Sequence, residues 1–250
     1  MARPPAETTI GAPPFPRELR WVNVATLRMD QQRGRPVLVE FWDFCRVGSL
    51  RTLPYVRAWH ERYADAGLRV VSVHSPGFPP SHDEDAVRAA VERLGIEHAV
   101  ALDSELELWS LYDNAGWPAR YLFDGDGVLA EYHLGEGGYA GTELAICKLL
   151  GIEGAEPVAP VRPEDDPEAL IVIPTADVEG AYSGPYEAGE AWAVLSGAGT
   201  IVVDGEARAV EHPGAHLLVA HPRHTAAVLE LEVGDGVTCH ATCFTPGLAA

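Results

Sequence analysis

Cys45 is the residue of this sequence whose position best suits chemistry, because it precedes the first long helical pattern, over residues 47–67. Free N–H groups and the positive end of a helix dipole favour a thiolate at such a position, so the sequence predicts an acidic, nucleophilic thiol. Arg46 would add to this effect. The alternative is that Cys45 is a small buried apolar residue, as free cysteines frequently are.

A second segment is expected to converge on Cys45. Trp117 and Pro118 precede a strand, and a cis peptide bond there would turn the backbone toward the helix start. Trp42 and Trp117 would then wall an apolar groove for a small ligand or peptide. His74, at the end of the strand pattern RVVSVH, would assist proton transfer there; the alternative is a structural histidine with satisfied hydrogen bonds.

The elements that position these residues alternate between strands and helices. Apolar β-branched runs predict strands over residues 36–42 and 69–74, around the first helix. Further helices are expected over DEDAVRAAVERLG, SELELWSLYDNAG and TELAICKLLG, and further strands over HAVAL, RYLFD and VLAEYH, the last two joined by the turn DGDG. The fold class is therefore α/β, with a mixed sheet flanked by helices.

The chain changes character after residue 151. Residues 152–168 are rich in proline and acidic residues and predict an extended linker. Residues 169–250 consist of short apolar runs separated by Gly, Pro and Asp-Gly turns, which predicts an all-β sandwich or jelly roll. We therefore expect a domain over residues 1–151, the linker, and a second domain over residues 169–250.

Several motifs within residues 12–151 resemble the thioredoxin-like, or redoxin, domain of the TlpA and DipZ type. They are FW at 41–42, LRTLPYVRAWHERY, VHSPGF, LGIEHAVALDSELELWSLYDNAGWPARYLFD and YHLGEGGYAGTE. The resemblance implies a thioredoxin fold with a central sheet of four or five strands, an active site at the first helix, and a cis bond before Pro118. The segment SGPYEAGEAWAVLSGAGTIVVDGEARAV resembles the β domain, similar to carbohydrate-binding modules, that follows in DipZ-like proteins. This implies a jelly roll beside the first domain, with a saccharide as one candidate ligand and no sugar-binding residue carried over.

The chain departs from this family at the redox dithiol. The resemblance places the two cysteines of the family's Cys-x-x-Cys motif at Arg46 and Ser49, so that Cys45 lies one residue before the first of them. A single thiol would attack a disulfide or peroxide and need an external thiol, such as glutathione, to resolve the product. Ser49 would hydrogen-bond the thiolate. We therefore predict a catalytic set of Cys45, Arg46 and Ser49.

The last forty residues contain a second group of reactive side chains. It comprises His212, His216, His221, His224, Cys239, His240 and Cys243. On a regular strand Cys239 and Cys243 would share one face about 13 Å apart, too far to chelate one ion together. One of these cysteines together with His221 and His224 would remain as a metal site. The alternative is that HPRH is a polar turn and that Cys239 and Cys243 are core residues. Cys147, in an apolar helix pattern, is expected to be a core residue.

The overall charge of the chain argues against two classes of binding partner. A formal net charge of -19 repels nucleic acid and anionic membranes. No apolar leader or spanning segment is apparent, and four scattered cysteines do not suggest a disulfide scaffold, so we expect a cytoplasmic protein without cofactors. Three functions are consistent with these features. The first is a single-thiol oxidoreductase or peroxidase that acts on a small thiol, peroxide or peptide. The others are a redox-inactive protein that binds a ligand, peptide or saccharide, and a metal-binding protein.

Overall fold

A six-stranded mixed sheet forms the centre of the N-terminal half in the computed structural model, which describes residues 9–249. Its strands run in the order β1-β4-β3-β2-β5-β6, with β2, β3 and β4 parallel and the others antiparallel to their neighbours. They are β1 (Arg20–Val22), β2 (Val37–Trp42), β3 (Arg69–His74), β4 (Ala99–Leu102), β5 (Ala119–Phe123) and β6 (Leu129–Leu134). The expected four or five strands become six because β1 pairs with the outer edge of β4.

Helices cover both faces of this sheet because the strand residues are apolar on both sides. Leu38 of β2 packs with residues of α1 (Val47–Tyr63) and α4 (Tyr139–Leu150). The next residue, Val39, packs on the other face with Leu108 of α3 (Glu107–Leu111). The remaining helix, α2 (Glu84–Arg93), contributes to the cluster at the carboxyl end of the parallel strands. We call this region, residues 9–151, the α/β part.

Residues 152–168 connect the two halves and lie against the α/β part. The Val158 amide donates to the Glu143 carboxylate, and the hydroxyl of Tyr55 in α1 donates to Asp165. A short 3-10 turn, Pro163–Asp165, is the only helical element of this segment. The connecting segment is therefore extended, as the composition predicts, yet fixed along α1 and α4.

Residues 169–249, which we call the β part, contain strands and turns but no helix. One sheet has the order β12-β9-β14-β8, a second has the order β11-β10-β13, and β7 pairs with β15. The inward residues of the first two sheets share one apolar cluster. The strands are β7 (Ile171–Val172), β8 (Val178–Glu179), β9 (Gly184–Gly197), β10 (Gly199–Val203), β11 (Glu206–Val210), β12 (Gly214–Leu229), β13 (Leu231–Val233), β14 (Val237–Thr245) and β15 (Gly247–Leu248). The structure is therefore α/β with an additional β-rich domain.

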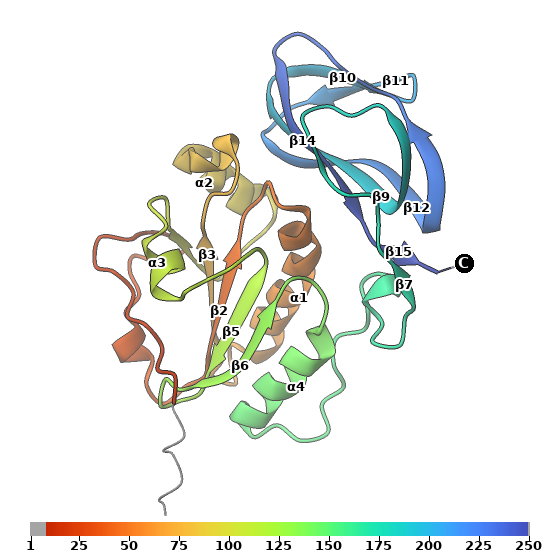
Figure 1. Cartoon of the computed structure of the whole chain (residues 1–250). Coiled ribbons are helices and arrows are strands. Elements are labelled where there is room, and N and C mark those ends of the chain that lie inside the picture. The colour runs from red at the N-terminus through yellow and green to blue at the C-terminus, as the bar shows by residue number, and fades with distance from the viewer. Residues whose placement is uncertain (1–8, 250) are drawn as a thin grey trace, which may run out of the picture.

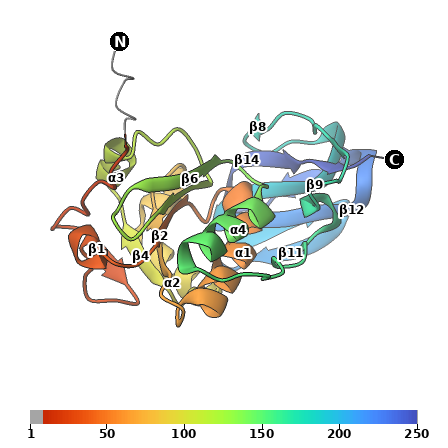
Figure 2. The same cartoon turned by 90° about the horizontal axis from the view of Figure 1, so that it is seen from below.

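The β part lies against the end of the α/β part at which α1 begins (Figures 1 and 2). Phe44 and Cys45 share a buried apolar cluster with Ala215 of β12 and Cys243 of β14. The Ala215 amide also donates to the Phe44 carbonyl at 3.2 Å. Gly214 has a φ of +135°, which L side chains rarely adopt, and a Cβ atom there would come within 3.1 Å of the Phe44 ring, so glycine is favoured at this contact. The β part therefore covers the residues that precede α1.

Among the helices that the structure describes, none combines the length and the apolar character needed to cross a membrane.

Candidate functional site

A cavity of about 320 Å³ lies where the two parts meet. Its wall on the α/β side includes Cys45, Arg46 and the Trp117-Pro118 turn. On the opposite side it is lined by Asp177 and by residues 243–246, which comprise the end of β14 and the residue that follows the strand. The expected convergence of the Cys45 and Trp117-Pro118 segments is therefore present, and the peptide bond before Pro118 is cis.

Cys45 is completely buried in this arrangement. Burial raises the pKa of its thiol well above the usual range, and the negative charge of Asp43 acts in the same direction. The Ser81 hydroxyl and the guanidinium groups of Arg46 and Arg93 oppose this shift without cancelling it. The prediction of an acidic thiol at the helix start is therefore wrong for this arrangement, because loss of hydration outweighs the helix dipole.

Asp43 organises the loop in front of α1. Its Oδ1 accepts the Cys45 amide at 2.8 Å, while Oδ2 accepts the Gly77 amide at 2.8 Å and the Ser81 hydroxyl at 3.0 Å. This fully buried carboxylate was not among the predicted site residues. An aspartate directly after a buried strand could have indicated it, because such a residue commonly caps the turn that follows.

Arg46 and Ser49, at the positions that the resemblance assigns to the dithiol, have different surroundings. The Arg46 guanidinium lies between two rings, 4.5 Å from the Phe78 centroid and 4.6 Å from the Trp117 centroid. Ser49 is buried, and its hydroxyl accepts the Asp43 amide at 3.2 Å. Ser49 is thus engaged with the backbone, and it is the Ser81 hydroxyl that partly offsets the effect of burial on the Cys45 pKa.

Two of the four predicted substrate-binding residues do not line the cavity. Trp42 is completely buried in the apolar cluster behind Cys45, so the prediction that it walls a groove is wrong. His74 is also buried; its ring stacks on Phe44 at 5.4 Å, and its Nε2 lies 3.7 Å from Asp43. Trp42 and His74 end the parallel strands β2 and β3, and the β part covers that end of the sheet. The sequence pattern did not indicate this cover.

Comparisons with known proteins agree with this geometry. The chain is 31% identical over 163 residues to Protein DipZ of Mycobacterium tuberculosis, covering 62% of this chain and 24% of DipZ. It is 26% identical over 138 residues to the thiol-disulfide oxidoreductase YkuV of Bacillus subtilis, covering 55% of this chain and 93% of YkuV. No family model matches the chain.

The fold is also found in a solved structure. A DsbE-type thiol:disulfide interchange protein of Chlorobium tepidum superimposes with a TM-score of 0.52 at 20% sequence identity, covering 58% of this chain and 99% of the other. The α/β part is a TlpA/DipZ-type thioredoxin-like domain. This domain is related to thiol-disulfide oxidoreductases, and the chain spans about a quarter of the length of DipZ.

Outside the thioredoxin-like domain, Cys239 and Cys243 do not share a face of β14. Cys239 pairs with Leu195, but Ala241 pairs with Val194, so β14 has a bulge between these residues. A bulge reverses the alternation of side chains beyond it. As a result Cys239 packs on the core of the β part, whereas Cys243 belongs to the buried cluster that contains Cys45. The prediction of a common face is wrong because it assumed a regular strand.

The C-terminal histidines do not assemble a metal site. His221 Nε2 is 2.8 Å from the Tyr186 hydroxyl, and the His212 and His216 rings stack at 4.5 Å. Within residues 9–249, no three His, Cys, Asp or Glu side chains are grouped closely enough to hold a metal ion. The expected set of one cysteine with His221 and His224 is therefore not formed. Cys147 lies in the core, as predicted.

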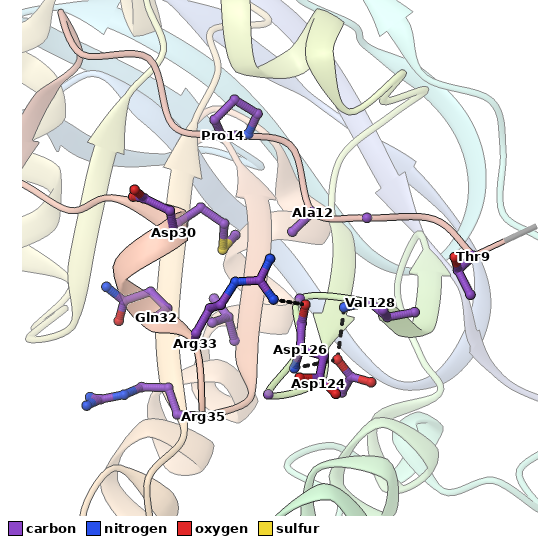
Figure 3. A pocket seen from close by; sticks show the side chains of 15 residues that line it. Thr9, Ala12, Pro14, Asp30, Gln32, Arg33, Arg35, Asp124, Asp126 and Val128 are labelled. Atoms are coloured by element: carbon purple, nitrogen blue, oxygen red, sulfur yellow. Dashed lines mark hydrogen bonds between the residues drawn. The ribbon is translucent and has the colours of Figure 1, made fainter.

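A second cavity, of about 250 Å³, lies at the other end of β2 (Figure 3). There Arg33 donates to the Asp126 carbonyl at 3.0 Å, and the Asp124 carboxylate accepts the Asp126 and Val128 amides at 2.9 Å each. These bonds hold the DGDG turn between β5 and β6, which confirms the hairpin. The polar groups of the turn are used in its own structure.

Proposed function

We propose that this chain is a thiol-dependent oxidoreductase in which Cys45 is the reacting thiol of the thioredoxin-like domain. The observation that carries the proposal is that Cys45 and the cis Trp117-Pro118 turn line one cavity. Relatives of this domain include a thiol-disulfide oxidoreductase. The sequence contains no Cys-x-x-Cys pair, so the first step at Cys45 produces a mixed disulfide with a small thiol or peptide.

The reaction requires the β part to move away from Cys45. In the closed arrangement the thiol is buried and its pKa is raised, so thiolate is scarce near neutral pH. Opening would hydrate the sulfur and remove the largest cause of the raised pKa, while Arg46 remains beside it as a positive charge. Reactivity would therefore depend on the population of the open form.

Disulfide exchange with the full chain tests this proposal. We expect bis(2-hydroxyethyl) disulfide to react at Cys45, which is detected by mass spectrometry of peptides under non-reducing conditions. Cys45→Ser should abolish this reaction, whereas Cys147→Ser, in a different apolar cluster, should not change it. Failure of Cys45 to react faster in the folded chain than Cys147 would overturn the proposal.

A redox-inactive binding role is the second candidate, and the position of Arg46 favours it. The cation is held between Phe78 and Trp117 at the edge of a cavity that has acidic and backbone polar groups. Such a cavity suits a small ligand or peptide. Under this alternative, calorimetry with glutathione would show binding that Arg46→Ala weakens and Cys45→Ser leaves unchanged.

A further inference from the structure

A second thiol lines the cavity that contains Cys45. Cys243 of β14 lies on the wall formed by the β part and belongs to the same apolar cluster as Cys45. The two residues are 198 positions apart, so no short motif joins them (243 − 45). The structure thus places two cysteines from the two parts of the chain in the lining of one cavity.

Arg46 acts on both sulfur atoms. Burial raises the pKa of each thiol, that of Cys243 to about 12, and the positive charge of Arg46 works against this shift at Cys45 and at Cys243 alike. Arg46 lines the same cavity as both cysteines, so its positive charge can act on either sulfur. Negative charge developing on either sulfur during an exchange reaction would be stabilised by the same cation.

Asp177 supplies a proton acceptor for Cys243. Its Oδ1 accepts the amide of Phe244, the residue after Cys243, at 3.0 Å. After burial, the negative charge of Asp177 is the next cause of the raised pKa of the Cys243 thiol. Asp177 also lines the cavity. The bulge in β14 makes this placement specific, because it directs Cys243 to the cavity and Cys239 to the core of the β part.

We propose that Cys243 is the resolving thiol for Cys45, so that the oxidised protein contains a Cys45–Cys243 disulfide between its two parts. This inference rests on the proposed function. First the Cys45 thiol loses its proton to solvent, and its sulfur attacks a small disulfide; the disulfide bond breaks, a mixed disulfide forms on Cys45, and one small thiolate leaves and takes up a proton.

In the second step the β part returns to its closed position, Cys243 gives its proton to Asp177, and its sulfur attacks the sulfur of Cys45. The mixed disulfide breaks, the Cys45–Cys243 bond forms, and the second small thiolate leaves with the proton from Asp177. The two cysteines lose two electrons in total, and the small disulfide is reduced to two thiols. No external thiol is then needed for resolution.

The test treats the full chain with bis(2-hydroxyethyl) disulfide and maps the products by non-reducing mass spectrometry. We expect the wild-type chain to lose two hydrogen atoms and to yield a peptide pair linked through Cys45 and Cys243, with loss of the mercaptoethanol adduct. In Cys243→Ser the adduct on Cys45 should persist. Cys239→Ser, on the same strand but facing away from the cavity, should still form the linked pair.

The outcomes separate this inference from the proposed function. A stable adduct on Cys45 in the wild-type chain, with Cys243 still reduced, would overturn the role of Cys243 and leave the role of Cys45 intact. A link from Cys45 to Cys239 or Cys147 would also overturn it. If Cys45 does not react in any of these chains, the proposed function fails, and the inference fails with it.

Discussion

Arg51 of α1 donates through Nη1 to Glu190 of β9 at 2.5 Å, which joins the thioredoxin-like domain to the β part beside the Cys45 cavity. The same guanidinium binds Glu136 at 2.7 Å and Glu164 of the connecting segment at 2.9 Å. Arg51 is only 4% exposed, so these ion pairs are shielded from solvent. Arg51 thus adds buried ion pairs to the apolar cluster and the Ala215–Phe44 hydrogen bond that hold the β part in its closed position.

Removing the charge of Glu190 should increase access to Cys45. Glu190→Gln weakens a charge-assisted hydrogen bond, and a loss of about 1.5 kcal/mol in the closed form raises the open population about tenfold. We expect iodoacetamide to label Cys45 about tenfold faster, as measured by peptide mapping over time. Arg51 keeps two other carboxylates, so the chain should remain folded.

Glu187→Gln is the matched control for this experiment. Glu187 lies on the same strand, its side chain is 68% exposed, and it is 3.7 Å from His224. Exposed pairs of this kind contribute little to stability, so labelling of Cys45 should be unchanged. Equal labelling rates in Glu190→Gln and the wild type would show that this ion pair does not hold the β part over Cys45.

Replacing Arg51 by lysine keeps the positive charge but removes the planar fork. A lysine ammonium cannot reproduce the three directed bonds to Glu136, Glu164 and Glu190. We expect the free energy of unfolding, measured by urea titration, to fall by about 2 kcal/mol. A change within about 0.5 kcal/mol, typical of ordinary surface substitutions, would contradict the central role of Arg51.

Features that depend on neighbours in sequence were predictable. The strand patterns and the first helix follow from periodicity, and β2 and α1 confirm them. The Arg51–Glu190 pair spans 139 positions, and no local pattern indicates it. The prediction of an acidic Cys45 used only the nearby helix start. In the structure the β part buries the thiol, and the loss of hydration raises its pKa.

The cavity wall formed by the β part was missed for a related reason. Strict alternation along VTCHATCF places Cys239 and Cys243 on one face, whereas one extra residue in β14 separates them. Bulges have no firm signature in a single sequence, so the partner of Cys45 was not predictable. Trp117 and Pro118 were placed correctly because the resemblance covers that segment.

The pH profile of Cys45 labelling should differ from that of an ordinary thiol. Only the thiolate reacts with iodoacetamide, and burial holds the Cys45 pKa above its usual range. The rate should therefore keep rising from pH 7 to pH 10, whereas the urea-unfolded chain should level off near its ordinary thiol pKa of about 8.5. A plateau below pH 8 in the folded chain would contradict the buried environment described for Cys45.

A buried polar chain within the thioredoxin-like domain makes stability depend on pH. Glu40 of β2 is fully buried, and burial raises the pKa of its carboxyl group to about 7 from an ordinary value of 4.5. The Ser72 hydroxyl donates to Glu40 at 2.7 Å and lies 2.7 Å from His98 Nε2. Burial lowers the pKa of His98 to about 3, so its contribution changes with pH in the opposite sense.

Glu40→Gln should remove one of these two opposing contributions. The folded state binds the Glu40 proton more tightly than the unfolded state, so its contribution to stability is complete below about pH 4.5 and is lost as pH rises through about 7. Relative to wild type, Glu40→Gln should gain about 3 kcal/mol between pH 4.5 and pH 8, as measured by urea unfolding at each pH. His98 is common to both chains and cancels in this difference.

The exposed Glu230→Gln serves as control, and its difference in stability from the wild type should not vary with pH. If Glu40→Gln and the wild type lose stability in parallel, Glu40 is ionised in the folded chain throughout this range, and the environment assigned to it is wrong.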